Sequence, residues 1–287
     1  NGMRGGGGEG LPSVSKRIAA TDEPCIVSMQ RMMAGKSGIL SLAQGIVHWT
    51  PPPNALQAAQ AAATDKSSHS YCADDGLPEL RDELKEKLRI DNKLSKSDVM
   101  VCSGSNQAYN NLVVSLLDPG DTAVLFLPYY FNHNMALQMN GVLVAHAPSS
   151  KDTLLPDLDW LRARLGDAAQ PKVKMVTLVN PGNPTGVVIP DAMLHEAKKI
   201  CAEAGSWLVV DNAYEYFTYE ASGDGPPHTC VEGEHVINTF SFSKSFGMMG
   251  WRVGYLAYPS RIKDALFKVQ DTVPICPPVL SQRLALA

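Results

Sequence analysis

The segment Ser241-Phe-Ser-Lys-Ser-Phe-Gly-Met-Met-Gly-Trp-Arg252 follows directly on Val236–Phe240, an apolar run with β-branched residues that is typical of a buried strand. Its only lysine, Lys244, stands among large apolar side chains. Burial among such groups lowers the pKa of an amine and favours the neutral nucleophile. Ser241 and Arg252 flank this lysine with a hydroxyl and a guanidinium, which together suit a phosphate. A lone lysine in a loop is more often a solvated charge, so this interpretation depends on the rest of the chain.

From residue 99 onward, short β-rich runs alternate with amphipathic stretches. The predicted strands are Val99–Cys102, Thr122–Leu127, Val142–His146, Val173–Val179, Trp207–Val210, Val236–Phe240 and Gly254–Tyr258. The predicted helices are Asn54–Ala63, Leu77–Leu88, Gln107–Leu117, Asn132–Met139, Asp157–Leu165, Asp191–Ala204 and Pro278–Ala287. Strands separated mostly by helices predict an α/β fold, with a mostly parallel seven-stranded sheet sandwiched by helices.

The composition argues against several classes of protein. The chain has 287 residues, 45% of them hydrophobic, and a net charge of −4. It can therefore bury a large core, and there is no electrostatic reason to expect nucleic acid or an anionic membrane as partner. No apolar run approaches the ~20 residues of a membrane span. The six cysteines form no C-x-x-C pair, so neither a metal site nor a disulfide framework is expected. A cytoplasmic protein fits best, with an organelle as the alternative.

Polar motifs follow several predicted strands, and ligands of such sheets bind beyond the carboxyl ends of the strands. Gly104, Ser105 and Asn106 lie between a strand and a helix, where free backbone N–H groups suit a phosphate, although Ser105 fits an ordinary N-cap equally well. Asp211 ends another strand and is followed by Tyr214, so that a carboxylate and a phenol are available to a heteroaromatic ring. Taken alone, a loop aspartate and a packing tyrosine are the simpler explanation of that pair.

Two more motifs also follow strands. Asn180-Pro-Gly-Asn-Pro-Thr-Gly186 is a rigid turn that either aims Asn183 at a ligand or is only a turn. Pro128-Tyr-Tyr-Phe131 supplies aromatic faces for stacking, although aromatic clusters are more often part of a core. Each signal is weak by itself, and their shared position at one edge of the predicted sheet is what gives them weight.

Together, Asn180–Gly186, Asp211-x-x-Tyr214 and Ser241-x-x-Lys244 resemble the class I and II aminotransferases of fold type I, which use pyridoxal 5'-phosphate (PLP). The resemblance covers roughly residues 20 to 287. Within the family, the chain looks most like plant-type aromatic aminotransferases that use methionine as amino donor. The stretches behind this narrower likeness are Leu42–Trp49, Pro128–Asn132, Asp211–Phe217 and Phe240–Arg252.

The resemblance implies a role for each matching residue. Lys244 would hold the cofactor as a Schiff base and then move the proton between the substrate Cα and the cofactor. Asp211 would pair with the pyridine nitrogen, and Asn183 and Tyr214 with the ring oxygen. The residues implied to hold the phosphate or to stack on the ring are Gly104, Ser105, Asn106, Ser241, Arg252 and Tyr130.

The resemblance also implies an assembly and a domain plan. Tyr71 looks like the tyrosine that reaches the phosphate of a partner subunit, which predicts a homodimer with shared sites. Gly45 and Asn183 are implied to contact substrate, although the Gly-x-Pro of many members is absent after Gln44. The expected plan is a disordered glycine-rich stretch (1–20), an N-terminal arm with part of a small domain (21–53), and a large PLP-binding domain (54–287). The rest of the small domain, with the arginine for the substrate α-carboxylate, is expected to lie beyond this sequence.

The predicted function is therefore PLP-dependent transfer of an amino group between an aromatic amino acid or methionine and a 2-oxo acid. Two alternatives remain at this stage. One is a PLP-dependent lyase on the same fold, which needs no 2-oxo acid acceptor. The other is a truncated PLP-binding protein without turnover.

Overall fold

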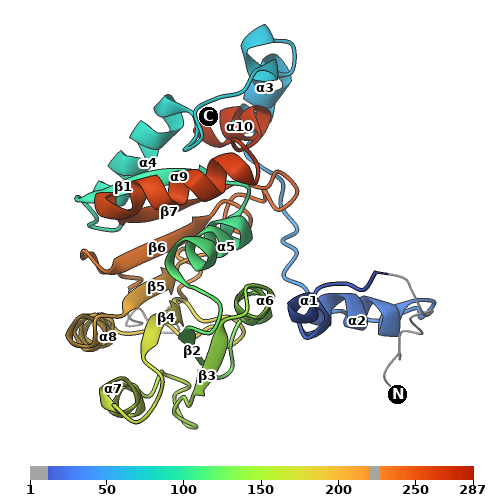
Figure 1. Cartoon of the computed structure of the whole chain (residues 1–287). Helices are drawn as coiled ribbons and strands as arrows, with labels where there is room; N and C mark the ends of the chain where they lie inside the picture. Colours follow the sequence, from blue (N-terminus) through green and yellow to red (C-terminus); the bar gives the residue numbers. More distant parts are fainter. Residues whose placement is uncertain (1–11, 220–226) are drawn as a thin grey trace.

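The computed structural model describes residues 12–219 and 227–287 of the chain. Within them, seven strands form one sheet in the order β1-β7-β6-β5-β4-β2-β3 (Figure 1). The strands are β1 Ser97–Cys102, β2 Thr122–Phe126, β3 Leu143–Ala147, β4 Val173–Val179, β5 Trp207–Asp211, β6 Val236–Ser241 and β7 Gly254–Pro259. All seven predicted strands are confirmed, to within two residues at each end.

The sheet is mostly parallel, as predicted. β3, β2, β4, β5 and β6 all pair in parallel, whereas β7 is antiparallel to both of its neighbours, β6 and β1. β1 therefore runs in the same direction as β6. Because the carboxyl ends of parallel strands meet at one edge of a sheet, Cys102, Asp211 and Ser241 end at the same edge. The polar motifs that follow these strands are brought together there.

The described part of the chain contains ten α-helices, of which α3 to α10 cover the two faces of the sheet. They are α1 Lys16–Ala19, α2 Cys25–Met33, α3 Pro53–Ala62, α4 Pro78–Ile90, α5 Ser105–Leu116, α6 Phe131–Met139, α7 Leu158–Gly166, α8 Asp191–Ala204, α9 Lys263–Thr272 and α10 Val279–Leu286, with 3-10 turns η1 Lys66–His69 and η2 Ser260–Ile262. The seven predicted helices are confirmed. The helices α1, α2 and α9 were not predicted, although Leu266 and Gln270 of α9 are buried one helical turn apart.

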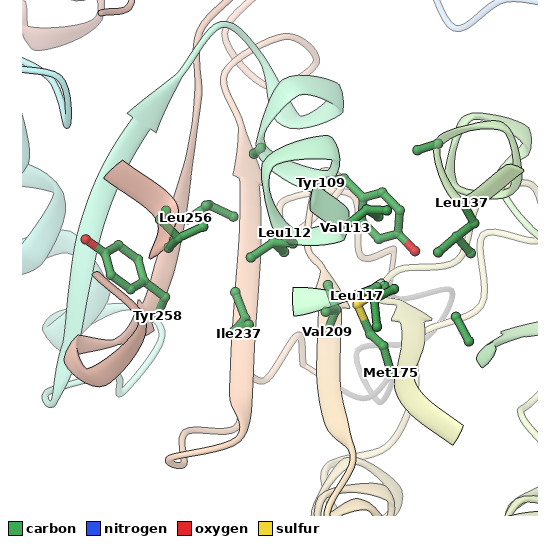
Figure 2. Packing of buried hydrophobic residues seen from close by; sticks show 14 of the residues in the cluster. Tyr109, Leu112, Val113, Leu117, Leu137, Met175, Val209, Ile237, Leu256 and Tyr258 are labelled. Carbon is green, nitrogen blue, oxygen red and sulfur yellow. The ribbon is translucent and has the colours of Figure 1, made fainter. Parts of the chain in front are cut away.

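The core is divided by the sheet into two sides, because alternate residues of a strand point to opposite faces. On one side α5, α6 and α9 pack on the sheet, with Tyr109, Leu112 and Met175 in the cluster that Figure 2 shows. On the other side α3, α4 and α10 cover the β1, β6 and β7 end of the sheet, and α7 and α8 cover the β2, β4 and β5 end. In β1, Met100 faces the first side and its neighbour Val101 the second.

The N-terminal arm, residues 12–52, lies to the side of these layers (Figure 1). Neither α1 nor α2 buries a side chain. The helix α1 falls inside the stretch for which disorder is expected, whereas residues 1–11 lie outside the described part of the chain. In the described ranges, no helix combines the length and the apolar character needed to cross a membrane.

Candidate active site

Lys244 lies in the turn that follows β6. Its Nζ donates a hydrogen bond of 2.5 Å to the backbone carbonyl of Gly45, from the N-terminal arm. Burial, and after it the positive charge of Arg252, lowers the pKa of the Lys244 amine. A lowered pKa leaves more of the amine neutral near pH 7, which a nucleophile or proton acceptor requires. The direction agrees with the effect expected from its apolar neighbours in the sequence.

Asp211 ends β5 with a side chain that is only 6% exposed. Its Oδ2 lies 3.0 Å from Nε2 of His133, and its Oδ1 accepts a hydrogen bond from the backbone N–H of Ala213. His133 comes from α6, and its ring stacks on Tyr109 with 4.1 Å between ring centroids. A buried carboxylate needs such partners, because burial without them is costly.

Tyr214 faces Gly45 from the turn after β5. A Cβ placed on Gly45 would lie 3.5 Å from the Tyr214 hydroxyl and 3.6 Å from Nζ of Lys244, so the glycine backbone passes close to both. Burial, followed by the neighbouring Tyr130 and Asp211, raises the pKa of the Tyr214 hydroxyl. This phenol therefore stays protonated near neutral pH and can donate a hydrogen bond.

Tyr130 stands at the start of α6, between the Asp211 pair and the N-terminus of α5. Its ring meets the His133 ring edge to face at 5.2 Å. Its hydroxyl accepts from Nδ2 of Asn132 at 2.8 Å and lies 3.4 Å from Oδ1 of Asn106. Two of the predicted site residues, Tyr130 and Asn106, are thus in contact.

A cradle of backbone and guanidinium groups forms where α5 begins. Gly104 precedes α5 with φ +87°, and a Cβ there would overlap the guanidinium of Arg252. A Cβ on Gly254 would lie 2.7 Å from the backbone nitrogen of Ser105, so this junction also needs glycine. Arg252 Nη1 lies 3.4 Å from Oγ of Ser243. A guanidinium beside the free N–H groups of a helix start is a site for an anion.

The remaining predicted residues occupy different positions around this group. Ser241 pairs with Gly254 across β6 and β7, beside the cradle, and its Oγ accepts from the backbone N–H of Ser243. Asn183 lines a small cavity together with His133. Tyr71 is 79% exposed, so most of its ring is uncovered in a single chain.

A buried polar network supports the turn that carries Asp211 and Tyr214. Lys87 of α4 donates to both carboxylate oxygens of Glu215, at 2.7 and 2.6 Å. Asn92 bridges the pair, since it accepts from Lys87 at 2.8 Å and donates to Glu215 at 2.9 Å. The Lys87 and Glu215 side chains are 20% and 8% exposed. Glu215 adjoins Tyr214, so this ion pair holds the turn against α4.

His228 joins this turn to the turn that carries Asn183. Its Nε2 lies 2.9 Å from Oδ1 of Asn212, and its ring also contacts the backbone of Asn180. Burial, and after it the charge of Lys87, lowers the pKa of His228 from 6.5 to about 4. The ring is therefore neutral at pH 7.

The family model of aminotransferase class I and II matches residues 37–287. The chain belongs to this family. An aromatic aminotransferase of Arabidopsis thaliana, ISS1, is 50% identical over 95% of this chain and 69% of its own length. An aspartate/prephenate aminotransferase of Thermus thermophilus is 30% identical over 95% of this chain and 71% of its own. These aminotransferases establish the chain as a PLP-dependent transaminase.

Solved structures agree with the family on the fold. The Thermus thermophilus aspartate aminotransferase tetra mutant 2 complexed with tryptophan superposes with a TM-score of 0.87 at 27% identity, over 96% of this chain and 72% of that one. The aromatic aminotransferase from Pyrococcus horikoshii gives a TM-score of 0.78 at 28% identity, over 91% and 69%. The fold is therefore fold type I, as the resemblance implied.

The residues of the site fit PLP. The cofactor needs an amine, an anion cup for its phosphate, a carboxylate for its pyridine nitrogen and an aromatic face. Lys244, the cradle at Gly104 with Arg252, Asp211 and Tyr130 supply these groups at one edge of the sheet. The cradle is the sharpest evidence, because the Arg252 guanidinium lies where any Cβ at Gly104 would stand and is thereby held beside the first N–H groups of α5.

Several supporting residues escaped the sequence analysis. His133 carried no signal beyond its place three residues after Tyr130, because it meets Asp211 only through the fold. Lys87 looks like one of several charges on an amphipathic helix, and its pairing with Glu215 spans 128 residues. Trp49 belongs to Leu42–Trp49, a stretch that supported only the family resemblance. In the structure its indole donates a hydrogen bond to the carbonyl of Ser245, in the Lys244 turn.

We expect Glu215→Gln to destabilise the protein by about 3 kcal/mol, because it leaves the buried Lys87 ammonium without its carboxylate. Urea unfolding followed by circular dichroism measures the change. Glu86→Gln is the matched control, since Glu86 pairs with Arg89 on the exposed side of the same helix. Equal stability of the two variants would contradict a structural role for the buried pair.

The neutral His228 ring predicts a pH dependence of stability. The unfolded chain takes up a proton near pH 6.5, whereas the folded ring resists protonation until about pH 4. The free energy of unfolding therefore decreases as the pH falls from 6.5 towards 4, by up to about 3 kcal/mol from this group. Urea unfolding at pH 7 and pH 4.5 should show a smaller difference in His228→Gln than in the wild type. The exposed His195 provides the control, because His195→Gln should keep the wild-type difference.

Proposed function

We propose that this transaminase moves the amino group of an aromatic amino acid or methionine to a 2-oxo acid, with Lys244 as the residue that bonds covalently to PLP. The observation that carries the cofactor site is the arrangement of the Lys244 amine, the Asp211–His133 pair and the Arg252 cradle at one sheet edge. The choice of substrate is supported by the 50% identity with the Arabidopsis aromatic aminotransferase. The curated relatives are named aminotransferases, which favours transamination over a lyase reaction.

The phosphate end of the cofactor is assigned to the cradle. Arg252 supplies two guanidinium N–H groups, and the N-terminus of α5, from Ser105 and Asn106, supplies backbone N–H groups and a favourable dipole. Ser241, at the end of β6, adds its hydroxyl. Gly104 keeps the backbone close enough for these donors to converge on one anion.

The ring end is assigned to Asp211, Tyr214, Asn183 and Tyr130. PLP, when bound, supplies an electron sink for the carbanion at the substrate Cα. Asp211 keeps a proton on the pyridine nitrogen, and His133 holds that carboxylate in place at 3.0 Å. Tyr214, a phenol whose pKa burial raises further above neutral pH, would donate to the ring oxygen together with the Asn183 amide. Tyr130 lies against the ring face.

Lys244 moves the proton. With PLP and substrate bound, the Lys244 amine would be the group that accepts the proton from the substrate Cα and returns it on the cofactor side. Its lowered pKa suits this exchange, because the neutral amine is the form that accepts a proton. Gly45, whose carbonyl accepts the Lys244 hydrogen bond, lies where an incoming substrate would meet this amine.

A homodimer follows from the same assignment. Tyr71 is exposed on this chain and is proposed to reach the phosphate in the partner's site. The arm carries exposed apolar side chains, among them Leu40 and Leu42, which a second copy would cover. We place residues 54–287 in the large PLP-binding domain and residues 21–53 in the arm and part of the small domain. The compartment is proposed to be the cytoplasm.

Borohydride reduction tests the cofactor site. The protein is incubated with PLP, reduced, digested and mapped by mass spectrometry. We expect a pyridoxyl group on the Lys244 peptide, because this amine is half-buried with a lowered pKa. Lys244→Ala should give no adduct, and the peptide of the ion-paired Lys87 should remain unmodified in both proteins. An adduct confined to another lysine in folded protein would refute the assignment.

A substrate screen tests the specificity. We expect kcat/KM for tryptophan, phenylalanine, tyrosine or methionine to exceed that for aspartate by at least about tenfold, because apolar side chains gain from contact with aromatic faces and a carboxylate does not. Each donor is assayed with and without an added 2-oxo acid. Preference for aspartate would contradict the proposed substrates, and product formation without a 2-oxo acid would indicate a lyase.

A further inference from the structure

The segment from Gly45 to Pro51 crosses the active site as a strap between α2 and α3. It has no regular secondary structure. At one end, the Gly45 carbonyl accepts the hydrogen bond from Lys244. Four residues later, Trp49 contacts both of the turns that carry the proposed catalytic groups.

Trp49 is attached to the Lys244 turn in two ways. Its indole Nε1 donates a hydrogen bond of 3.2 Å to the carbonyl of Ser245, the residue after Lys244. Its backbone also presses on Gly247, where a Cβ would lie 2.7 Å from the Trp49 carbonyl oxygen. Gly247 belongs to the same turn, since its N–H donates to the Lys244 carbonyl.

Trp49 is attached to the Tyr214 turn through Phe217. The two rings are stacked, with centroids 6.3 Å apart and planes 21° apart. Phe217 donates its backbone N–H to the carbonyl of Tyr214 at 2.8 Å, and its ring meets the Tyr214 ring edge to face at 5.7 Å. The indole therefore spans the two turns.

The chain before the strap is held far less firmly. Leu40 and Leu42 are 87% and 91% exposed, and no residue from 34 to 50 is buried, so the strap differs from the preceding stretch in its contacts rather than in its burial. The arm is also attached at Asp22, whose carboxylate accepts hydrogen bonds from Asn134 and Gln138 of α6. Between Asp22 and α3, Gln44 accepts a side-chain hydrogen bond from Gln30 within the arm, whereas Trp49 hydrogen-bonds to and stacks on the turns that follow β6 and β5.

We propose that Trp49 is a positioning residue that fixes Gly45 over the Lys244 amine, so that the strap forms the substrate side of the site. This inference rests on the substrate contact proposed for Gly45. Trp49 acts through the backbone of the strap, and the proton transfer itself stays with Lys244. Loosening the strap therefore weakens substrate binding more than it slows the chemistry, which appears in KM rather than kcat.

Steady-state kinetics and hydrogen exchange of the PLP-saturated enzyme test the proposal. We expect Trp49→Ala to raise KM for the amino donor about tenfold with kcat changed less than about threefold, since the ring stack and one hydrogen bond are lost together. The hydrogen-bonded amides of Phe246 and Gly247, which lie beside Trp49 in the Lys244 turn, should exchange about tenfold faster. Trp49→Phe keeps a ring for Phe217 but loses the hydrogen bond, so its KM should lie between those of the wild type and Trp49→Ala.

Two further variants distinguish loosening of the strap from a general loss of protein stability. Trp160→Ala removes a tryptophan of α7 that packs on the core, so it should lower thermal stability without changing KM or exchange at Phe246 and Gly247. Phe217→Leu should raise KM by itself and add little to Trp49→Ala, because both changes break one stack. A Trp49→Ala enzyme with unchanged KM and unchanged exchange would overturn the proposal, as would a fall in kcat at constant KM.

The exchange measurement also separates this inference from the proposed function. If the wild type transaminates no amino donor, the proposed substrates fail, while faster exchange at Phe246 and Gly247 in Trp49→Ala still supports the anchoring of the strap. Unchanged exchange in that case refutes the anchoring as well.

Discussion

The antiparallel pairing of β1 with β7 is the constraint on which the active site depends. Its register sets Cys102 opposite Gly254, and the pairing of β7 with β6 sets Gly254 opposite Ser241. The start of α5 is thereby pressed against the segment between β6 and β7, where Arg252 sits over Gly104. A slip of one residue would turn the side chains of β7 to the other face of the sheet and carry the guanidinium away from the helix terminus. Residues 150 positions apart in the sequence form one anion cup because of this register.

The sequence predicted the parts of the structure that depend on local pattern. The seven strands and the seven predicted helices were confirmed because their apolar periodicity is strong and their ends carry turn residues. The antiparallel direction of β7 had no local signal, since pairing direction is a property of the sheet. The residues proposed from motifs, such as Asp211, were visible because they directly follow strands. Their supports, His133 and Lys87, were missed because each reaches its partner only across the fold. Their roles in catalysis remain predictions.

The two ends of the proposed cofactor site are stabilised by different interactions. The phosphate end depends on backbone approach, where glycines leave room for N–H groups and a guanidinium to converge. The ring end depends on buried side-chain pairs, whose desolvation must be offset by their mutual attraction and by further hydrogen bonds. The Glu215 carboxylate accepts three hydrogen bonds, two from the Lys87 ammonium and one from the Asn92 amide. The turn that carries Asp211 and Tyr214 is thus fixed from beneath by charge, without any contribution from the cofactor.

The proposed substrate side of the site is held by weaker contacts. Its backbone runs over the surface, and its anchor is a half-exposed indole rather than a buried ion pair. Contacts of this kind open at a small fraction of the free energy of global unfolding. A site that must exchange an amino acid for a 2-oxo acid in each cycle needs such a side, since a strap as rigid as the cofactor side would trap the product. In the proposed homodimer, the exposed leucines of the arm would gain burial against the second copy. Assembly would then limit how far the strap opens, so that substrate exchange and subunit contact act on the same short segment of chain.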